Sequence, residues 1–151
     1  MNQKSDDDLL RDLDSADEYV RAQAAVTLVA RQHPRALEAS LRTLNDAPEI
    51  AHADVTPAIW SLAGLGLPAL QALLEPMADP DPMTRLHAGR AAMEITKRRF
   101  GYDGRDWPEG GYTRWANWWL GIDNRYDAAP DARKAAICRL RAACKAWLEG
   151  A

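Results

Sequence analysis

The stretch that decides the fold is ADPDPMTRLHAGRAAMEI, residues 78–95, because a related stretch, DSADEYVRAQAAVTLV, occupies residues 14–29. The two stretches start 64 residues apart, and both place an Asp-containing turn before an arginine and a run rich in alanine. A repeated structural unit explains why the same residue types recur in the same order. Arg85 is therefore interpreted as part of a repeat rather than as part of an active site.

Three copies of the unit align with steps of 31 and 33 residues. In each copy a short helix with leucines at i, i+3 or i+4 precedes a turn rich in Asp, Pro and Ala, and a longer Ala-rich helix follows. The apolar positions that coincide are Leu10, Leu41 and Leu74; Leu13, Leu44 and Met77; Ala24, Val55 and Ala88; and Leu28, Ile59 and Ala92. The sequence thus predicts three helical hairpins, at about residues 6–32, 34–65 and 67–99.

The turns indicate where each second helix begins. The two prolines of ADPDP cannot continue the preceding helix, because proline lacks an amide donor and clashes with the turn before it. Asp81 is expected to cap the next helix with Pro82 at its first position, and Asp17 is expected to cap the equivalent helix of the first copy. In the second copy Asp54 is the expected cap, which would place Pro57 in the first turn.

The pattern L..L.D.D..VR..A...L resembles HEAT repeats, in particular the short bacterial HEAT-like form that also occurs in phycobilisome lyases. The first copy matches it with Leu10, Leu13, Asp14, Asp17, Val20, Arg21, Ala24 and Leu28, and the third copy with Leu74, Met77, Asp79, Asp81, Arg85 and Ala88. The second copy departs from it, since Pro48 stands at the position of Asp17 and His52 at that of Arg21.

This resemblance implies an all-α fold, namely an α-solenoid of about three HEAT-like helical hairpins in a single domain, residues 1–151. It also implies a structural ladder in which the turn aspartate and the following arginine bond between adjacent repeats. The residues at these positions are Asp17, Arg21, Asp81 and Arg85. A structural role is favoured over ligand binding for the two arginines, since a guanidinium can pair with a carboxylate and bond turn carbonyls as well.

The composition changes after the repeats. Glycines and a proline predict a loop over residues 100–112, and capping helices are expected over residues 113–149, the first capped by Thr113. Three tryptophans share one face of that helix: Trp115, Trp118 and Trp119. They are similar to the Trp-rich element that closes many bacterial HEAT-like stacks and would cover the last repeat. The final helix, residues 131–148, is amphipathic and basic, a pattern typical of a packed surface helix and also of membrane or nucleic-acid binding.

Charge is unevenly distributed along the 151 residues. Residues 1–82 hold 6 Lys/Arg and 14 Asp/Glu, whereas residues 83–151 hold 13 and 8. No apolar run approaches the ~20 residues of a membrane span, and no signal-peptide pattern opens the sequence. Cys138 and Cys144, six apart in one expected helix, are predicted to be free thiols. A cytoplasmic location is expected.

The sequence lacks the common catalytic motifs. The sequence has no HExxH, no paired Cys/His spacing and no GxSxG elbow, and no lysine and hydroxyl pair follows GLGLP. The expectation is therefore no enzyme activity, no metal and no cofactor. The resemblance leaves two exceptions, the HEAT-like bilin lyases and the HEAT-like DNA glycosylases. The acidic first half argues against the second, since it would repel phosphates.

Polar positions beside the apolar stripes of successive second helices are expected to line a concave face. These positions are Gln23, Asp54 and His87, extended by Arg90, Glu94 and Arg98, with Tyr102, Arg105 and Trp107 as a rim. The predicted function is a non-catalytic adaptor or scaffold that binds a protein or peptide there. Two alternatives remain: a nucleic-acid binder that uses the basic C-terminal half, or a regulatory subunit or inhibitor of an enzyme. The oligomeric state stays open.

Overall fold

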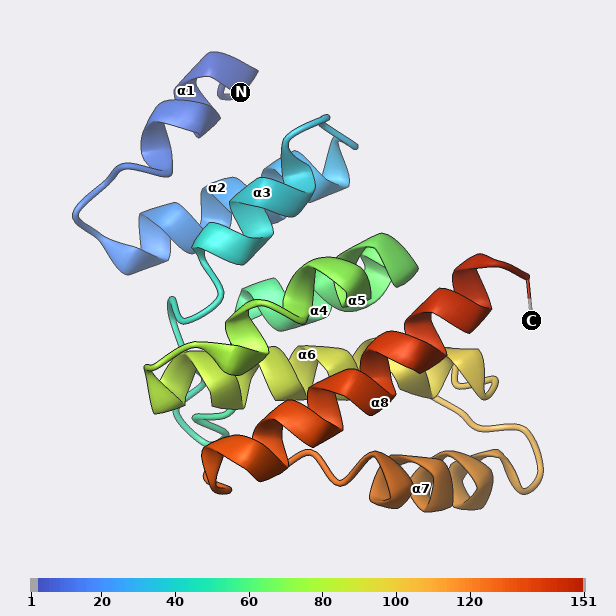
Figure 1. The fold of residues 1–151 in the computed structure, drawn as a ribbon. Helices are drawn as coiled ribbons and strands as arrows, with labels where there is room; N and C mark the ends of the chain where they lie inside the picture. Colours follow the sequence, from blue (N-terminus) through green and yellow to red (C-terminus); the bar gives the residue numbers. More distant parts are fainter. Residues whose placement is uncertain (1–2, 151) are drawn as a thin grey trace.

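The structure is a computed structural model that describes residues 3–150, and this part of the chain is all-helical (Figure 1). It contains eight α-helices and one short 3-10 helix, joined without any strand within the described range. In chain order the elements are α1 (Asp6–Asp12), α2 (Glu18–Ala30), α3 (Ala36–Arg42), α4 (Pro57–Leu65), α5 (Leu67–Leu73), η1 (Pro76–Ala78), α6 (Pro82–Arg99), α7 (Gly111–Ile122) and α8 (Pro130–Leu148).

The predicted caps of α2 and α6 are confirmed. The Asp17 carboxylate accepts a hydrogen bond from the Tyr19 amide at 2.8 Å, and the Asp81 carboxylate accepts one from the Met83 amide at 3.2 Å. Pro82 occupies the first position of α6. Helices α2 and α6 therefore each begin where a short acidic side chain satisfies an amide that the helix itself leaves unpaired.

Two expected helix starts are wrong. Helix α4 begins at Pro57 after the extended residue Thr56, whose hydroxyl donates to the Leu44 carbonyl at 2.8 Å. Asp54 lies in a turn in which the Val55 amide donates to the His52 carbonyl at 2.9 Å, and it caps no helix. Helix α7 begins at Gly111 rather than after Thr113. Gly110, at φ 73°, turns the chain in a left-handed conformation that glycine adopts easily, and this places the cap and the helix start three residues earlier.

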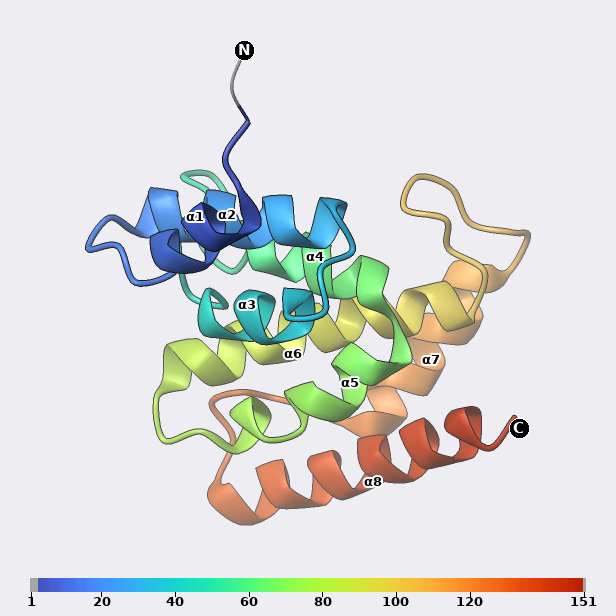
Figure 2. The same cartoon turned by 90° about the horizontal axis from the view of Figure 1, so that it is seen from above.

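The second helices of the three hairpins pack as successive neighbours. Helices α2, α4 and α6 contact one another in that order, and α7 packs against α6. Helix α1 packs against α2, α3 packs against both α2 and α4, and α5 packs against α6, while α8 lies along α5 (Figures 1 and 2). The last two helices thus cover both the α6 side and the α5 side of the third hairpin.

Two buried clusters hold these helices together. A smaller cluster joins α1, α2 and α3 through side chains such as Leu9, Leu13 and Leu28. A larger cluster joins α4, α5 and α6 to the last two helices, with Leu62, Leu70, Ile95, Leu140 and the partly buried Trp118 and Trp119 among its members. The tryptophan-rich segment therefore packs on the third hairpin, as its spacing predicted.

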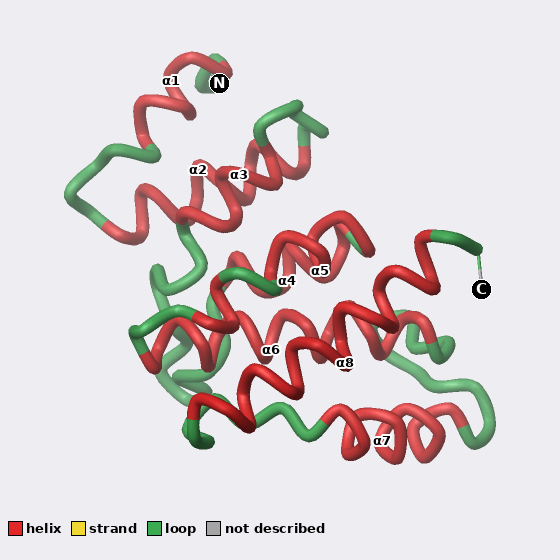
Figure 3. The backbone as a smooth tube through the Cα atoms, in the orientation of Figure 1, coloured by secondary structure: helices red, strands yellow, loops and turns green. Residues whose placement is uncertain are grey.

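Long connections separate some of the helices. Figure 3 shows the two longest, residues 43–56 between α3 and α4 and residues 100–110 between α6 and α7. Both cysteines are free, as predicted, with Cys138 exposed and Cys144 buried. Within residues 3–150, every helix is too short or too polar to cross a bilayer.

Candidate functional site

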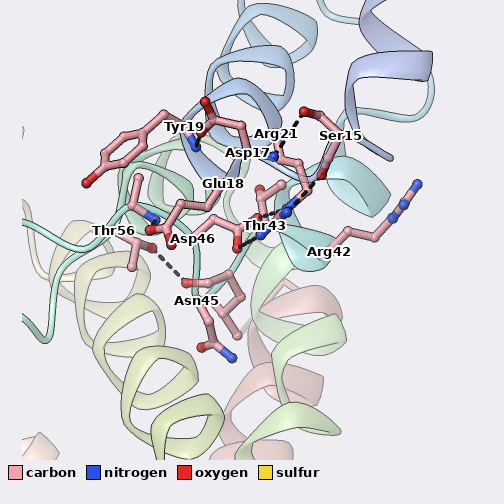
Figure 4. Close-up of polar contacts among 12 residues, drawn as sticks. Ser15, Asp17, Glu18, Tyr19, Arg21, Arg42, Thr43, Asn45, Asp46 and Thr56 are labelled. Atoms are coloured by element: carbon pink, nitrogen blue, oxygen red, sulfur yellow. Dashed lines mark hydrogen bonds and ion pairs between the residues drawn. The ribbon is translucent and has the colours of Figure 1, made fainter.

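Arg21 joins the first hairpin to the second. Its Nε and Nη2 donate to the two carboxylate oxygens of Asp46 at 2.9 and 2.8 Å, and its Nη1 donates to the Ser15 carbonyl at 2.8 Å (Figure 4). The hydrogen bonds that Arg21 donates to the Asp46 carboxylate raise the pKa of Arg21 above its ordinary value. Glu18 adds a second link, since its carboxylate accepts from the Ala47 amide at 2.8 Å. These contacts tie the turn before α2 to the segment after α3.

Arg85 makes the corresponding contacts in the third hairpin, but with different partners. Its Nη1 donates to the carbonyls of Asp79 and Pro80 at 2.8 and 2.9 Å, and its Nε donates to the Tyr126 carbonyl at 2.8 Å. The guanidinium thus fastens the turn before α6 to the connection between α7 and α8. Asp17 and Asp81 pair with neither arginine within 4.0 Å and act as helix caps instead.

His87 does not lie on an exposed face, so the expectation that it presents its ring to a partner is wrong. It is 1% exposed. Its Nδ1 lies 2.6 Å from Asn45 Oδ1, and its Nε2 lies 3.0 Å from the Ala53 carbonyl. Asn45 also donates to the Thr84 hydroxyl at 2.8 Å. The connection between α3 and α4 covers the ring, and His87 holds that connection against α6.

Glu94 is also buried, at 2% exposure, so it cannot contact a partner directly as expected. Three cations surround its carboxylate: Lys97 Nζ at 2.9 Å, Arg90 Nε at 3.4 Å and Arg98 Nη1 at 3.7 Å. Arg90 reaches Asp54 as well, at 3.1 Å. The buried carboxylate therefore holds three basic side chains in place along the outer edge of α6.

Aromatic rings continue this cluster into the connection after α6. Tyr102 stacks on Trp107 with ring centroids 4.7 Å apart, and Trp107 lies 6.0 Å from Trp115. The Arg98 guanidinium lies over the Tyr102 ring at 5.7 Å, and Lys97 Nζ lies over the Trp115 ring at 5.1 Å. Cations over aromatic faces are attracted by the ring quadrupole, so charges and rings fix one another.

We refer to this group as the α6 cluster, defined as Arg90, Glu94, Lys97, Arg98, Tyr102 and Trp107. The structure brings together five of the nine predicted contact residues in it, and Asp54 joins through Arg90. Gln23 is exposed on α2, where it lines a separate cleft between α1 and α2. Arg105 is exposed in the connection, where its amide donates to Asp103 at 2.8 Å.

Lys97 is the member of the α6 cluster that the predicted site lacked. The sequence could have predicted its place there from its spacing to Glu94. Arg90 lies four residues before the glutamate, and Lys97 and Arg98 lie three and four residues after it. Residues at these spacings are neighbours on a helix surface. One acid among three bases at i−4, i+3 and i+4 therefore indicates a charge cluster centred on the acid.

Within residues 3–150, no three His, Cys, Asp or Glu side chains converge in a way that could hold a metal ion. Comparison of the chain with family models, with curated proteins and with solved structures yielded no match.

Proposed function

We propose that this chain is a non-catalytic protein-interaction module that binds a protein or peptide at the α6 cluster and its rim. The observation that carries the proposal is the fixed arrangement of Arg98, Tyr102 and Trp107, three partly exposed side chains supported by a buried carboxylate and by stacking. Arginine and large aromatic residues dominate binding energy at protein interfaces. Side chains that are already ordered lose less entropy when a partner binds.

The architecture that we propose for this function is a short HEAT-like solenoid of three helical hairpins, closed by α7 and α8. The successive contacts of α2, α4 and α6 support it, as do the arginines that link the turn of one unit to a later segment. Stacks of this kind present neighbouring second helices on one extended face and commonly use that face to bind proteins.

The charge balance of the α6 cluster favours a protein over a nucleic acid at this face. Three cations share the Glu94 carboxylate, and Arg90 also pairs with Asp54, so most of the positive charge is already compensated. A nucleic-acid site draws its affinity from cations that are free to neutralise phosphates. A mixed set of charged and aromatic groups suits the surface of a protein, including an enzyme that this chain would regulate.

Helix α8 supports the second candidate, a nucleic-acid binder. Lys134, Arg141 and Lys145 are exposed, and no carboxylate of residues 3–150 lies within 4.0 Å of them. Salt dependence separates the two candidates, because phosphate contacts predict an affinity that falls by orders of magnitude between about 50 and 200 mM salt.

The test uses affinity capture from an extract of the cells that produce the protein, both nuclease-treated and untreated. The bait variant carries Arg98→Gln with Arg105→Gln, which removes charge without placing a new anion against Glu94. The control carries Arg11→Gln with Arg35→Gln, two arginines of exposed ion pairs in the first half of the chain. All baits are checked for an unchanged unfolding midpoint.

The expected result is a protein that the wild type and the control capture and that the Arg98/Arg105 variant loses. Capture that is equal for all three baits removes the α6 cluster as the binding surface. Capture that disappears after nuclease treatment supports the nucleic-acid candidate instead.

A further inference from the structure

A second surface, separate from the α6 cluster, lies between α5 and α8. The two helices run side by side (Figure 2), and a groove of about 1020 Å³ follows their contact and continues past η1. One side is lined by Gln71 of α5 and by Leu74, Glu75 and Ala78 after it, and the α8 side extends from Pro130 to Leu148. The groove thus spans the full 19 residues of α8, or about 28 Å at the rise of an α-helix.

The floor of the groove is apolar and recessed. Leu74, Ile137 and Cys144 line it while each is less than a tenth exposed, and Leu148 lies half exposed at one end. The α8 positions that face the groove recur every three or four residues, which is the spacing that lets a further helix pack along a helix surface. A recessed apolar floor of this shape suits a helix laid into the groove.

The rim of the groove is basic. Arg133, Lys134, Arg141 and Lys145 line it. Arg133 donates to the Ala128 carbonyl at 2.7 Å, and the other three are the exposed cations without a carboxylate partner among residues 3–150. Two carboxylates, Glu75 and Glu149, also line the groove, so cations exceed anions along it.

We propose that the groove between α5 and α8 docks an acidic amphipathic helix of another protein, about five turns long. Apolar side chains along one face of that helix would cover the groove floor, and flanking Glu or Asp side chains would pair with the rim cations. The complementary charge of the rim, together with the length and spacing of the groove, carries this assignment. It does not depend on binding at the α6 cluster.

The acidic helix α1 of a second copy does not supply such a helix. Helix α1 is acidic in its first turn, yet its apolar side chains Leu9 and Leu13 are already buried against α2 and α3. A membrane or a nucleic acid fits the groove less well than a helix does. Insertion into lipid requires apolar groups that protrude, whereas these are recessed, and phosphates gain nothing from an apolar floor.

Cys138 offers a readout of occupancy in the unmodified chain. It lines the groove and is exposed, whereas the other cysteine, Cys144, is buried. A helix that fills the groove should therefore slow the reaction of the Cys138 thiol with an aromatic disulfide reagent. This rate reports on the groove, while fluorescence anisotropy of a labelled peptide reports the affinity.

The probe is a 19-residue helical peptide with leucines at heptad positions a and d and glutamates beside them, and the control peptide replaces each glutamate with lysine. We expect the acidic peptide to bind and to protect Cys138, and the lysine peptide to bind at least tenfold more weakly. Lys134→Glu with Lys145→Glu should weaken the acidic peptide by about tenfold, since each exposed ion pair contributes a few-fold in affinity. The matched variant, Arg105→Glu with Arg114→Glu, should leave its affinity within about twofold.

Three outcomes overturn the proposal. The acidic peptide fails to protect Cys138 at millimolar concentration, or both peptides bind equally, or phosphatidylserine vesicles or a DNA duplex protect the thiol while the peptide does not. The outcome is independent of the capture experiment, because the Arg98/Arg105 variant should bind the acidic peptide as the wild type does.

Discussion

His87→Ala should destabilise the protein by about 3 kcal/mol. The ring is 1% exposed and makes two polar contacts, at 2.6 Å to Asn45 Oδ1 and 3.0 Å to the Ala53 carbonyl. Each hydrogen bond is worth about 1 kcal/mol net, and the space left by the ring adds about 1 kcal/mol more. Asn45 and Ala53 are themselves exposed, so water can replace the lost partners and limits the cost.

The assay is urea unfolding followed by circular dichroism, with thermal unfolding as a second measure. For a chain of this size a loss of about 3 kcal/mol corresponds to a fall of roughly 6–12 °C in the melting temperature. The connection between α3 and α4, residues 43–56, should also become more sensitive to proteolysis, because His87 is a main contact between it and α6.

His52→Ala is the matched control, since His52 lies in the same connection and is exposed. A surface substitution of this kind should change the stability by less than about 0.5 kcal/mol. The double variant His87→Ala with Asn45→Ala should lose less than the sum of the two single variants, because the two residues share a contact. A loss below about 1 kcal/mol for His87→Ala, or equal losses for the two histidine variants, would refute the reasoning.

Three further predictions follow from local contacts. Trp115→Phe removes the buried indole N–H donor to a threonine hydroxyl at 3.0 Å and should cost about 1–2 kcal/mol in urea unfolding. Thiol titration should find only Cys138 reactive in the folded protein, because Cys144 is buried. Burial also raises the pKa of the Cys144 thiol. The wild type should therefore lose stability relative to Cys144→Ala as the pH rises above about 8.5, where the thiol of the unfolded chain ionises. Hydrogen bonds from the Thr84 hydroxyl, which is the larger cause, and from the Met83 amide lower the pKa of Asp81. The stability advantage of the wild type over Asp81→Asn should therefore be constant above about pH 4 and should shrink as the pH falls below it.

The α6 cluster was partly predictable. The sequence places Arg90 and Arg98 on a long helix and Tyr102 and Trp107 in the loop of glycine and proline that follows it. The structure brings these four residues together. The burial of Glu94 was not predictable, because the sequence places this residue beside the apolar stripe, among positions expected to be exposed. Its burial arises because the long side chains of the neighbouring cations fold over it.

The contacts of Arg21 and Arg85 also depend on segments that are distant in the sequence. Their positions in the repeat were evident from the sequence, whereas their partners were not. Arg21 reaches Asp46, 25 residues away, and Arg85 reaches the Tyr126 carbonyl, 41 residues away, in a connection that has no counterpart in the first copy. A pairing over such distances depends on how complete hairpins pack.

The sequence by itself determined the helices, their approximate boundaries, the caps at Asp17 and Asp81 and the two free thiols. These features follow from periodicity, proline geometry and hydrogen bonds between residues a few positions apart. The tertiary structure alone decided that His87 is covered by the connection before α4, and that α8 lies along α5 to leave a basic groove. The physical reason is that spacing along a helix defines which face a residue occupies, whereas burial depends on the distant segment that packs against that face.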